Sequence, residues 1–223
     1  MLEHIFRPQC IACGALAETL CEPCTSSLVE LGRACEYCAE PITRGTSCVR
    51  CIVSPLPLDR VVSAWRFGGQ LATAIRRLKF SGKSHVARGV APLWTPLVAA
   101  AVRDRDAIVV PVPLHWRRRL VRGYDHTWHL SLHVCGLAKL PPPVPALVRV
   151  RHGPPQSTLE QAARRENLRD AFAVRRSVTG RAVVLLDDVV TTGATMAAAA
   201  RPLFAAGATA VVGVALARAT SSP

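Results

Sequence analysis

The chain has 223 residues, half of them hydrophobic, and a formal net charge of +13 with a sequence pI near 10.2. A mean hydropathy of +0.23 and enough length for a buried core exclude a disordered basic tail. The longest apolar stretch, 202–217, is shorter than the roughly 18 to 20 residues that cross a bilayer. The first ten residues hold an acid and no apolar signal core. We therefore expect a cytoplasmic protein, and a peripheral position at the inner face of the cell membrane stays open.

Charge and cysteine both divide the chain near residue 60. Residues 1–60 hold five arginines and seven acids, a net charge of −2, whereas the remainder holds 23 cations and eight acids, a net charge of +15. Eight of the nine cysteines lie between Cys10 and Cys51. The proline-punctuated segment 54–59 separates the two parts. We predict two domains, a cysteine-rich module over 1–57 and a larger domain over 58–223.

The eight cysteines of the first part form four C-x-x-C pairs. In such a turn two thiolates converge on one ion, and two turns complete a closed tetrahedral site. The pairs predict two structural zinc sites rather than a disulfide framework, which needs an oxidising compartment. Sequential use of the pairs is simplest, and interleaved use stays open. The pairs are Cys10 with Cys13, Cys21 with Cys24, Cys35 with Cys38, and Cys48 with Cys51.

Beyond residue 58, short β-branched runs alternate with alanine-rich helical stretches. This alternation is typical of an α/β fold with a largely parallel sheet flanked by helices. Pro202 is expected to kink or end the last helix. In chain order, the sequence predicts a strand over 61–67, helices over 70–80 and 86–103, a strand over 107–111, a helix over 127–137, strands over 146–150 and 182–186, a helix over 192–205 and a strand over 210–216.

The predicted helix over 127–137 carries two kinds of side chain with metal-binding or nucleophilic chemistry. Cys135 lies among apolar residues, so we expect a buried thiol rather than a nucleophile. His126, His129 and His133 share a possible helical face, but no acid or cysteine lies at a matching spacing. We therefore expect ordinary surface or groove histidines rather than a metal site.

The segment 183–195, VVLLDDVVTTGAT, places two acids and a Thr/Gly loop between a buried strand and a helix. Such a loop offers backbone N–H groups and hydroxyls to a phosphate, which the helix dipole also favours. Asp187 and Asp188, at the strand end, can accept hydrogen bonds from the 2′ and 3′ hydroxyls of a ribose. This predicts a ribose 5-phosphate site, and helix capping by the two acids is the alternative. The loop residues expected to hold the phosphate are Thr191, Thr192, Gly193, Ala194 and Thr195.

Four arginines follow the strand that is predicted to end at residue 111. Guanidinium groups suit bidentate phosphate recognition, and arginines so closely spaced repel each other unless an anion lies near. We expect polyanion binding here, with a solvated basic face as the alternative. His115 and Trp116 precede the arginines, and an aromatic ring among cations can stack on a base. The four are Arg117, Arg118, Arg119 and Arg122.

The segment 183–195 resembles the phosphoribosyl pyrophosphate (PRPP) signature of type I phosphoribosyltransferases. With the cysteine pairs in front, the whole chain resembles the ComF/GntX family of competence-related proteins. Three further stretches carry this resemblance: RRLKFSGK (76–83), VVPVPLHWRRRLVRGYDH (109–126) and PPQSTLEQAARRENLRDAFAV (154–174). The family's usual Gly-Phe-Asn-Gln is replaced here by Gly123, Tyr124, Asp125 and His126, so both amide side chains are lost.

The resemblance implies a type I phosphoribosyltransferase-like fold that binds PRPP, or another phosphoribosyl ligand, together with Mg²⁺. It implies that the four arginines grip the pyrophosphate. Gln156, Ser157, Arg164 and Arg165 lie in a stretch that resembles the mobile loop over PRPP. For the two arginines of this stretch, a solvated helical face is the alternative.

Three functions follow from these features. The first is a PRPP-binding protein that handles single-stranded DNA during natural transformation. The net charge of +15 on the part beyond residue 60 can neutralise the phosphates of the DNA. The second is an active Mg²⁺-dependent phosphoribosyltransferase with an unknown acceptor. The third is a catalytically inactive PRPP sensor or adaptor, whose zinc module docks a DNA-uptake helicase or membrane machinery. The replacements at Asp125 and His126 leave transfer activity open.

Overall fold

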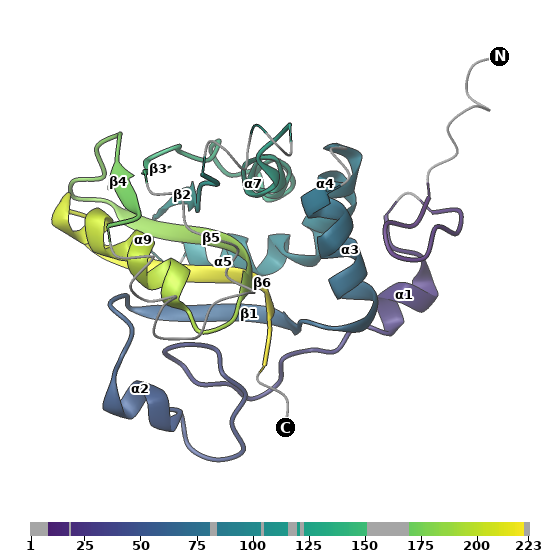
Figure 1. Ribbon diagram of the computed structural model, residues 1–223, viewed down its shortest axis with the longest axis horizontal. Helices are drawn as coiled ribbons and strands as arrows, with labels where there is room; N and C mark the ends of the chain where they lie inside the picture. The colour runs from purple at the N-terminus through teal and green to yellow at the C-terminus, as the bar shows by residue number, and fades with distance from the viewer. Residues whose placement is uncertain are drawn as a thin grey trace.

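The central element of the protein is a parallel sheet of four strands. The computed structural model describes residues 9–17, 19–80, 84–103, 105–115, 120, 123–150 and 170–220. The strand order is β1-β6-β5-β2, and each neighbouring pair is parallel (Figure 1). The predicted α/β fold with a largely parallel sheet is confirmed. The four strands are β1 (Arg60–Arg66), β2 (Ile108–Pro111), β5 (Ala182–Val190) and β6 (Ala210–Arg218).

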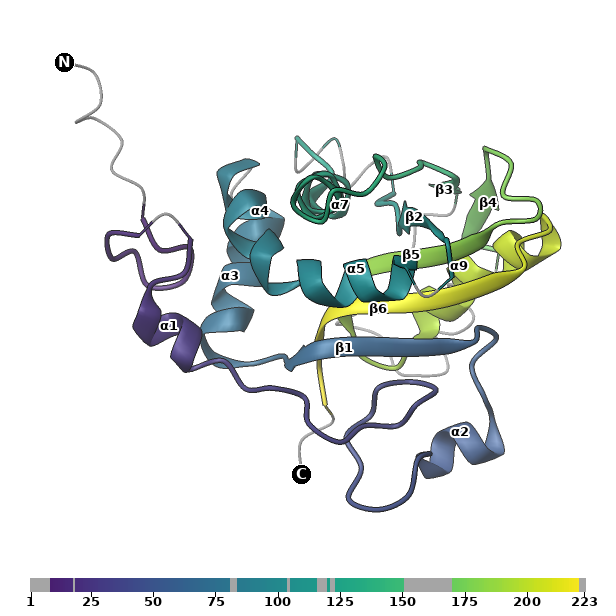
Figure 2. The same cartoon turned by 180° about the vertical axis from the view of Figure 1, so that it is seen from behind.

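Helices cover both faces of this sheet. Side chains alternate along β5: Val184 and Leu186 pack with α3, α4, α5 and α7, whereas Val183 and Leu185 pack with α9. The helix α9 faces the viewer in Figure 1 and α5 faces the viewer in Figure 2. Among the described residues, none of the helices is both long and apolar enough to cross a membrane. The helices are α3 (Gly69–Phe80), α4 (Ser84–Val90), α5 (Thr95–Arg103), α7 (His126–Leu137) and α9 (Ala194–Ala205).

Prolines affect the helices in two different ways. The helix predicted over 86–103 is divided into α4, a 3₁₀ turn (Ala91–Leu93) and α5, because Pro92 and Pro96 lack the N–H groups that a continuous helix needs. The Thr95 hydroxyl donates to the Ala91 carbonyl oxygen at 2.9 Å across this break. By contrast, α9 continues past Pro202 to its last residue, so Pro202 does not end that helix.

A second, smaller sheet lies apart from the parallel one. The strand predicted over 146–150 is present as β3 (Leu147–Arg149), but it pairs antiparallel with β4 (Phe172–Val174) and does not join the main sheet. The strand β4 lies at the end of the stretch 154–174 and was not predicted from the sequence. Arg149 and Phe172 lie opposite each other in this pair, and the guanidinium lies 5.5 Å from the centre of the phenyl ring.

The first cysteine segment packs against the helices of the main sheet. It includes the short helix α1 (Glu22–Ser26), which lies near α3 in both ribbon views. Cys10, Ile11 and Leu20 belong to the same apolar core as α3, α4 and α5. Ile11 lies so close to α4 that a Cβ at Gly89 would be 3.1 Å from its Cγ2 atom.

The second cysteine segment, with the short helix α2 (Val49–Val53), packs along β1. Residues that precede α2 in the sequence cover the outer edge of β1. Leu31 N–H donates to the Ala64 carbonyl at 3.0 Å, and Val61 N–H donates to the Tyr37 carbonyl at 3.0 Å. Covering an edge strand in this way removes unpaired backbone groups from solvent. Both cysteine segments therefore pack on the α/β core, and the domain boundary at 57 stays a prediction.

Close packing between β6 and α9 gives a stability prediction. A Cβ at Gly213 would lie 2.5 Å from Met196 Sδ and 3.2 Å from both Leu58 Cδ1 and Val61 Cγ2. Gly213→Ala is therefore expected to lower the free energy of unfolding by about 1 to 3 kcal/mol in urea denaturation.

The matched control is Gly136→Ala, at an exposed position of α7 where no atom lies within 4 Å of the added Cβ. It is expected to raise the free energy of unfolding by up to about 1 kcal/mol, because alanine is the better helix former. Equal destabilisation by both substitutions would contradict the packing at Gly213.

Candidate functional site

A pocket of about 220 Å³ lies at the carboxyl ends of β2 and β5, where α7 and α9 begin. Open parallel sheets commonly bind ligands at this edge. A larger cavity of about 440 Å³ beside β1 is lined by both apolar and polar residues, and its two acids, Glu36 and Asp59, are not adjacent in the sequence. The polar residues of the smaller pocket are Lys79 from α3, His126 and Thr127 from α7, Arg149 from β3, Asp187 and Asp188 from β5, and Thr195 from α9.

The Asp188 carboxylate forms the centre of this pocket. It is 3% exposed, and its Oδ2 atom lies 2.9 Å from Lys79 Nζ and 3.1 Å from His126 Nε2. The Lys79 side chain is 27% exposed and reaches Asp188 from the last turn of α3. A buried carboxylate needs such partners, because burial without them is costly.

The two neighbouring acids titrate in opposite directions. Burial acts to raise the pKa of Asp188, but the Lys79 ammonium and the hydrogen bond from His126 outweigh it and hold the pKa below its usual range. Burial and the Asp188 charge raise the pKa of Asp187 to about 7. Asp188 is therefore ionised at neutral pH, while Asp187 exchanges a proton near neutrality.

Each acid has one oxygen that accepts no hydrogen bond from the described residues. Asp187 Oδ1 accepts the backbone N–H of Asp188 at 2.9 Å. Among the described residues, no hydrogen bond reaches Asp187 Oδ2 or Asp188 Oδ1. Both acids lie within β5, which continues to Val190, and not at its end as predicted. The capping alternative is wrong, because the N-cap of α9 is Gly193.

The predicted phosphate loop divides between two pockets. Gly193 adopts a left-handed conformation, with φ of 79°, and Ala194 N–H donates to Thr192 Oγ1 at 3.3 Å. Thr195 faces the acids, whereas Thr192 and Ala194 line a separate pocket of about 170 Å³ on which segment 54–57 also lies. Thr191 is exposed. The structure thus brings Asp187, Asp188 and Thr195 together, next to the first turn of α9, whose N–H groups lack intrahelical partners.

The two residues that replace the family's amide side chains both have structural contacts. Asp125 is the N-cap of α7, since its Oδ1 accepts the Trp128 N–H at 3.1 Å and its Oδ2 accepts the Leu114 N–H at 3.3 Å. His126 is 3% exposed, lines the pocket and contacts Asp188, so of the two expected positions it has the groove and not the surface. Lys79 was also missed as a site residue, and its place in the RRLKFSGK stretch was the available signal.

Several predicted site residues lie outside the described part of the chain. They are Trp116, the four arginines Arg117, Arg118, Arg119 and Arg122, and the mobile-loop residues Gln156, Ser157, Arg164 and Arg165. Their assignments stay predictions. Cys135 is described, and it is the buried thiol that the sequence predicts: it is 2% exposed, and burial raises its pKa to about 11.

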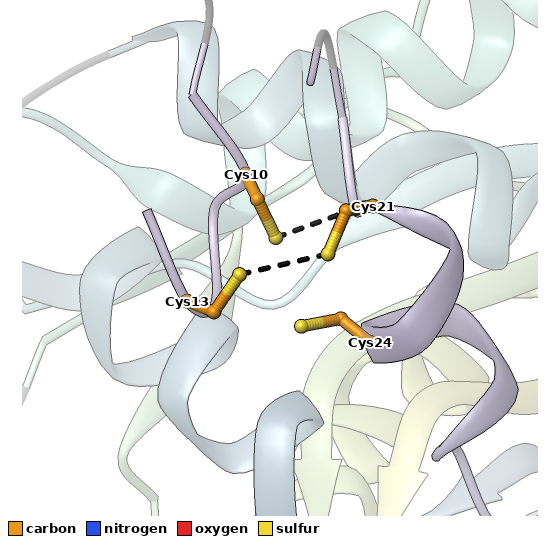
Figure 3. Close-up of side chains that lie close together, drawn as sticks. All are labelled: Cys10, Cys13, Cys21 and Cys24. Atoms are coloured by element: carbon orange, nitrogen blue, oxygen red, sulfur yellow. Dashed lines mark hydrogen bonds between the residues drawn. The ribbon is translucent and has the colours of Figure 1, made fainter. Parts of the chain in front are cut away.

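The eight N-terminal cysteines gather into two groups of four. One group is Cys10, Cys13, Cys21 and Cys24, and the other is Cys35, Cys38, Cys48 and Cys51; in each, all sulfurs lie within 4.8 Å of one another. The structure therefore selects sequential use of the pairs. Figure 3 shows the first group, with the four sulfurs facing a common centre.

The geometry of both groups fits a tetrahedral ion. Cys13 Sγ lies 3.5 Å from Cys21 Sγ, and Cys38 Sγ lies 3.5 Å from Cys48 Sγ. A zinc ion with Zn–S distances of about 2.3 Å places its sulfurs about 3.8 Å apart. The Cys21 N–H also donates to Cys10 Sγ at 3.3 Å, as expected for a thiolate ligand. Both groups could hold zinc.

The pKa values of these thiols indicate that four thiolates need a cation. Burial opposes ionisation of Cys10 and Cys35, but backbone N–H groups outweigh it and lower their pKa values to about 6 and about 7. Burial and the neighbouring sulfurs raise the pKa of Cys24 to about 12. The last thiol of the first group is therefore protonated at neutral pH unless a metal ion displaces the proton.

The first group is tied to α3, which lines the pocket, and the second group is tied to β6, the strand that pairs with β5. Arg77 Nη1 of α3 donates to the Cys10 carbonyl at 3.4 Å, and α3 also carries Lys79. Arg218, at the end of β6, donates to the Cys38 carbonyl at 2.8 Å and forms an ion pair with Glu40.

Comparison with known proteins finds relatives along most of the chain. The chain is 32% identical over 200 residues to the DNA utilization protein YhgH of Escherichia coli K12, which covers 86% of this chain and 87% of the relative. It is 28% identical over 205 residues to competence protein F of Haemophilus influenzae (86% and 89%) and 25% identical over 197 residues to competence protein ComFC of Bacillus subtilis (85% and 80%). No protein-family model matches the chain.

The raised pKa of Asp187 predicts how stability varies with pH. Because the folded state holds this proton more tightly than the unfolded state, the Asp187 contribution favours folding at low pH and is lost as pH rises toward about 7. Asp187→Asn removes this loss. The free energy of unfolding of the variant, relative to the wild type, is expected to rise between pH 5 and pH 8 by at least about 1.4 kcal/mol, the equivalent of one pKa unit.

Urea denaturation at several pH values measures this difference. Asp106→Asn, at an exposed loop position, is the control and is expected to show no such trend. A difference between Asp187→Asn and the wild type that stays constant with pH would contradict the raised pKa.

Proposed function

Because the chain belongs to the ComF/GntX family, with DNA utilization protein YhgH and competence proteins F and ComFC as relatives, we propose that it binds a phosphoribosyl ligand such as PRPP and handles single-stranded DNA during DNA uptake. One observation carries the ligand part of this proposal. The pocket joins two adjacent acids, the first turn of α9 and three basic side chains. The names of the relatives and the charge of the chain support the DNA part.

The pocket has the groups that a sugar phosphate requires. Asp187 and Asp188 each offer an oxygen to ribose hydroxyls. The first turn of α9 offers backbone N–H groups and the helix dipole to a 5-phosphate, with Thr195 on the pocket side. Lys79 and Arg149 add positive charge for further phosphate groups. A ligand with hydroxyls and several phosphates therefore fits the groups that line this pocket.

Mg²⁺ would accompany PRPP and neutralise its pyrophosphate. The carboxylate oxygens of Asp187 and Asp188 are of the kind that Mg²⁺ prefers. We further propose that the four arginines of 117–122 contact the same pyrophosphate. These residues supply positioning and charge neutralisation, and the metal ion supplies additional positive charge at the leaving group.

We propose that each cysteine group holds one structural zinc ion. Four thiolates close the coordination sphere and leave no position for a reacting water, so zinc acts as a scaffold. The exposed apolar residues Val49, Ile52 and Val53 of α2 offer the DNA-uptake machinery a docking surface. Such a role places the protein in the cytoplasm, at the inner face of the cell membrane.

The DNA part of the proposal depends on charge. Residues 61–223 carry +15, and neutralisation of phosphates by lysine and arginine supplies most of the affinity of non-specific DNA binding. Binding of the phosphoribosyl ligand and binding of DNA depend on different side chains. The ligand requires the acids of the pocket, whereas DNA requires only lysine and arginine. This difference allows them to be separated by substitution.

A second candidate function is transfer of the phosphoribosyl group to an acceptor. The observation that favours it is the pKa of Asp187 near 7, since a general acid or base works best when its pKa lies near the working pH. Release of pyrophosphate from PRPP on addition of candidate acceptors would establish this function, and its absence with all acceptors would favour the inactive sensor or adaptor.

The ligand proposal predicts the effect of one substitution. Asp187→Ala removes a carboxyl group that faces the pocket, so it is expected to weaken binding of PRPP with Mg²⁺ at least tenfold, about 1.4 kcal/mol, in calorimetry. Asp106→Ala, remote from the pocket, is the control with unchanged affinity. Failure of the wild type to bind PRPP, or equal binding by Asp187→Ala, would overturn the proposal.

The DNA proposal predicts a steep salt dependence. The affinity for a single-stranded oligonucleotide is expected to fall at least tenfold between 50 and 200 mM salt, measured by fluorescence anisotropy, because bound counterions are released. Replacing Arg117, Arg118 and Arg119 by alanine is expected to weaken binding and reduce this dependence. Affinity that does not vary with salt would show that backbone charge does not carry the interaction.

A further inference from the structure

Leu56 connects the second cysteine group to the phosphate loop. It follows the ligand Cys51 by five residues. Its side chain packs against the apolar cluster formed by Cys35, Cys38 and Cys51. The same side chain also packs against the apolar core that contains Met196 and the other buried residues of α9. One leucine therefore belongs to both clusters.

The contact with the loop is made at the backbone of Gly193. A Cβ built on Gly193 would lie 2.6 Å from Leu56 Cδ1 and 3.5 Å from Leu56 Cδ2. Leu56 thus occupies the space that a side chain at this position would take. Gly193 is also the N-cap of α9 and has a left-handed conformation. Leu56 therefore packs against the residue at which the helix begins.

The segment that carries Leu56 is stiff and fixed at both ends. Pro55 and Pro57 flank it, and the proline ring restricts φ. On one side, Ser54 N–H donates to the Arg50 carbonyl at 2.8 Å, within the turn that contains Cys51. On the other side, Asp59 Oδ2 accepts the Val211 N–H of β6 at 2.6 Å. A change in the cysteine group is therefore transmitted to Leu56 rather than absorbed by a flexible linker.

We propose that Leu56 is a positioning residue through which the second cysteine group, when it holds its metal ion, fixes the phosphate loop at Gly193. With the four thiolates drawn to one ion, α2 and the Pro-Leu-Pro segment are held and Leu56 keeps the first turn of α9 in its binding conformation. Without the ion, the cysteine cluster loosens and so does the loop. The ligand in this inference rests on the proposed function; the contact with the loop does not.

The chain provides a matched control. Ile42 packs against the same cysteine cluster as Leu56, whereas the three atoms nearest to the Cβ position of Gly193 all belong to Leu56. Ile42→Ala and Leu56→Ala therefore remove a similar apolar volume from one cluster, and only the second removes the contact with the loop. Leu56→Met restores a long apolar side chain and is the conservative variant.

The experiment uses the full, zinc-loaded chain and two measurements. Hydrogen–deuterium exchange reports the protection of the amides of 197–200, which begin with Ala197, whose N–H donates to the Gly193 carbonyl at 2.9 Å. Calorimetry with inorganic phosphate reports the loop's affinity for an anion. Leu56→Ala is expected to retain two zinc ions per chain, to speed exchange of these amides at least tenfold and to weaken phosphate binding at least fivefold. Leu56→Met is expected to restore both, and Ile42→Ala to leave both unchanged.

Loss of the metal is tested with Cys51→Ser, which is expected to retain one zinc ion and to reproduce the faster exchange at 197–200. Exchange at wild-type rates in Leu56→Ala, or equal acceleration by Ile42→Ala, would overturn the inference. If the wild type does not bind phosphate, the proposed ligand is wrong, whereas the exchange measurement still decides whether Leu56 positions the loop. Should Leu56→Ala fail to fold, Leu56→Val is measured with the same expectations.

Discussion

The buried Asp188 carboxylate is the constraint on which the arrangement of the pocket depends. A carboxylate that is almost inaccessible to solvent is stable only beside positive or hydrogen-bonding partners. Its partners come from two helices, because Lys79 lies in α3 and His126 begins α7. Both helices must therefore converge on β5. This convergence builds the pocket walls, and it leaves Asp187 as the neighbour whose own ionisation is suppressed.

The cysteine groups stabilise this arrangement from two directions. The first group contacts α3 through Arg77 and α4 through Ile11, so it supports the helix that delivers Lys79 to Asp188. The second group contacts β6 through Arg218 and the phosphate loop through Leu56. Metal binding in a closed four-cysteine site contributes directly to folding energy. The two cysteine groups thus support the pocket through α3, α4, β6 and the phosphate loop.

Local signals in the sequence predicted much of this structure. The four parallel strands, the cysteine groups and the paired acids follow from apolar runs, C-x-x-C spacing and a strand–loop–helix motif. The three-residue strand β4 was missed, because its pairing with β3 depends on contacts across more than 20 residues of chain. Lys79 and His126 were missed as partners of Asp188 for the same reason, since they lie about 109 and 62 positions away along the chain. The partners of a buried carboxylate such as Asp188 can be identified only when the fold is known, because they lie far from it in the sequence.

We propose that the acids of β5 and the first turn of α9 form one site for a sugar phosphate. A crystal structure of the protein with PRPP and Mg²⁺ tests this claim most directly. We expect a ligand whose ribose hydroxyls contact Asp187 and Asp188 and whose 5-phosphate lies at the first turn of α9. A ligand bound in another cavity, or a phosphate directed away from α9 with the ribose far from both acids, would contradict it.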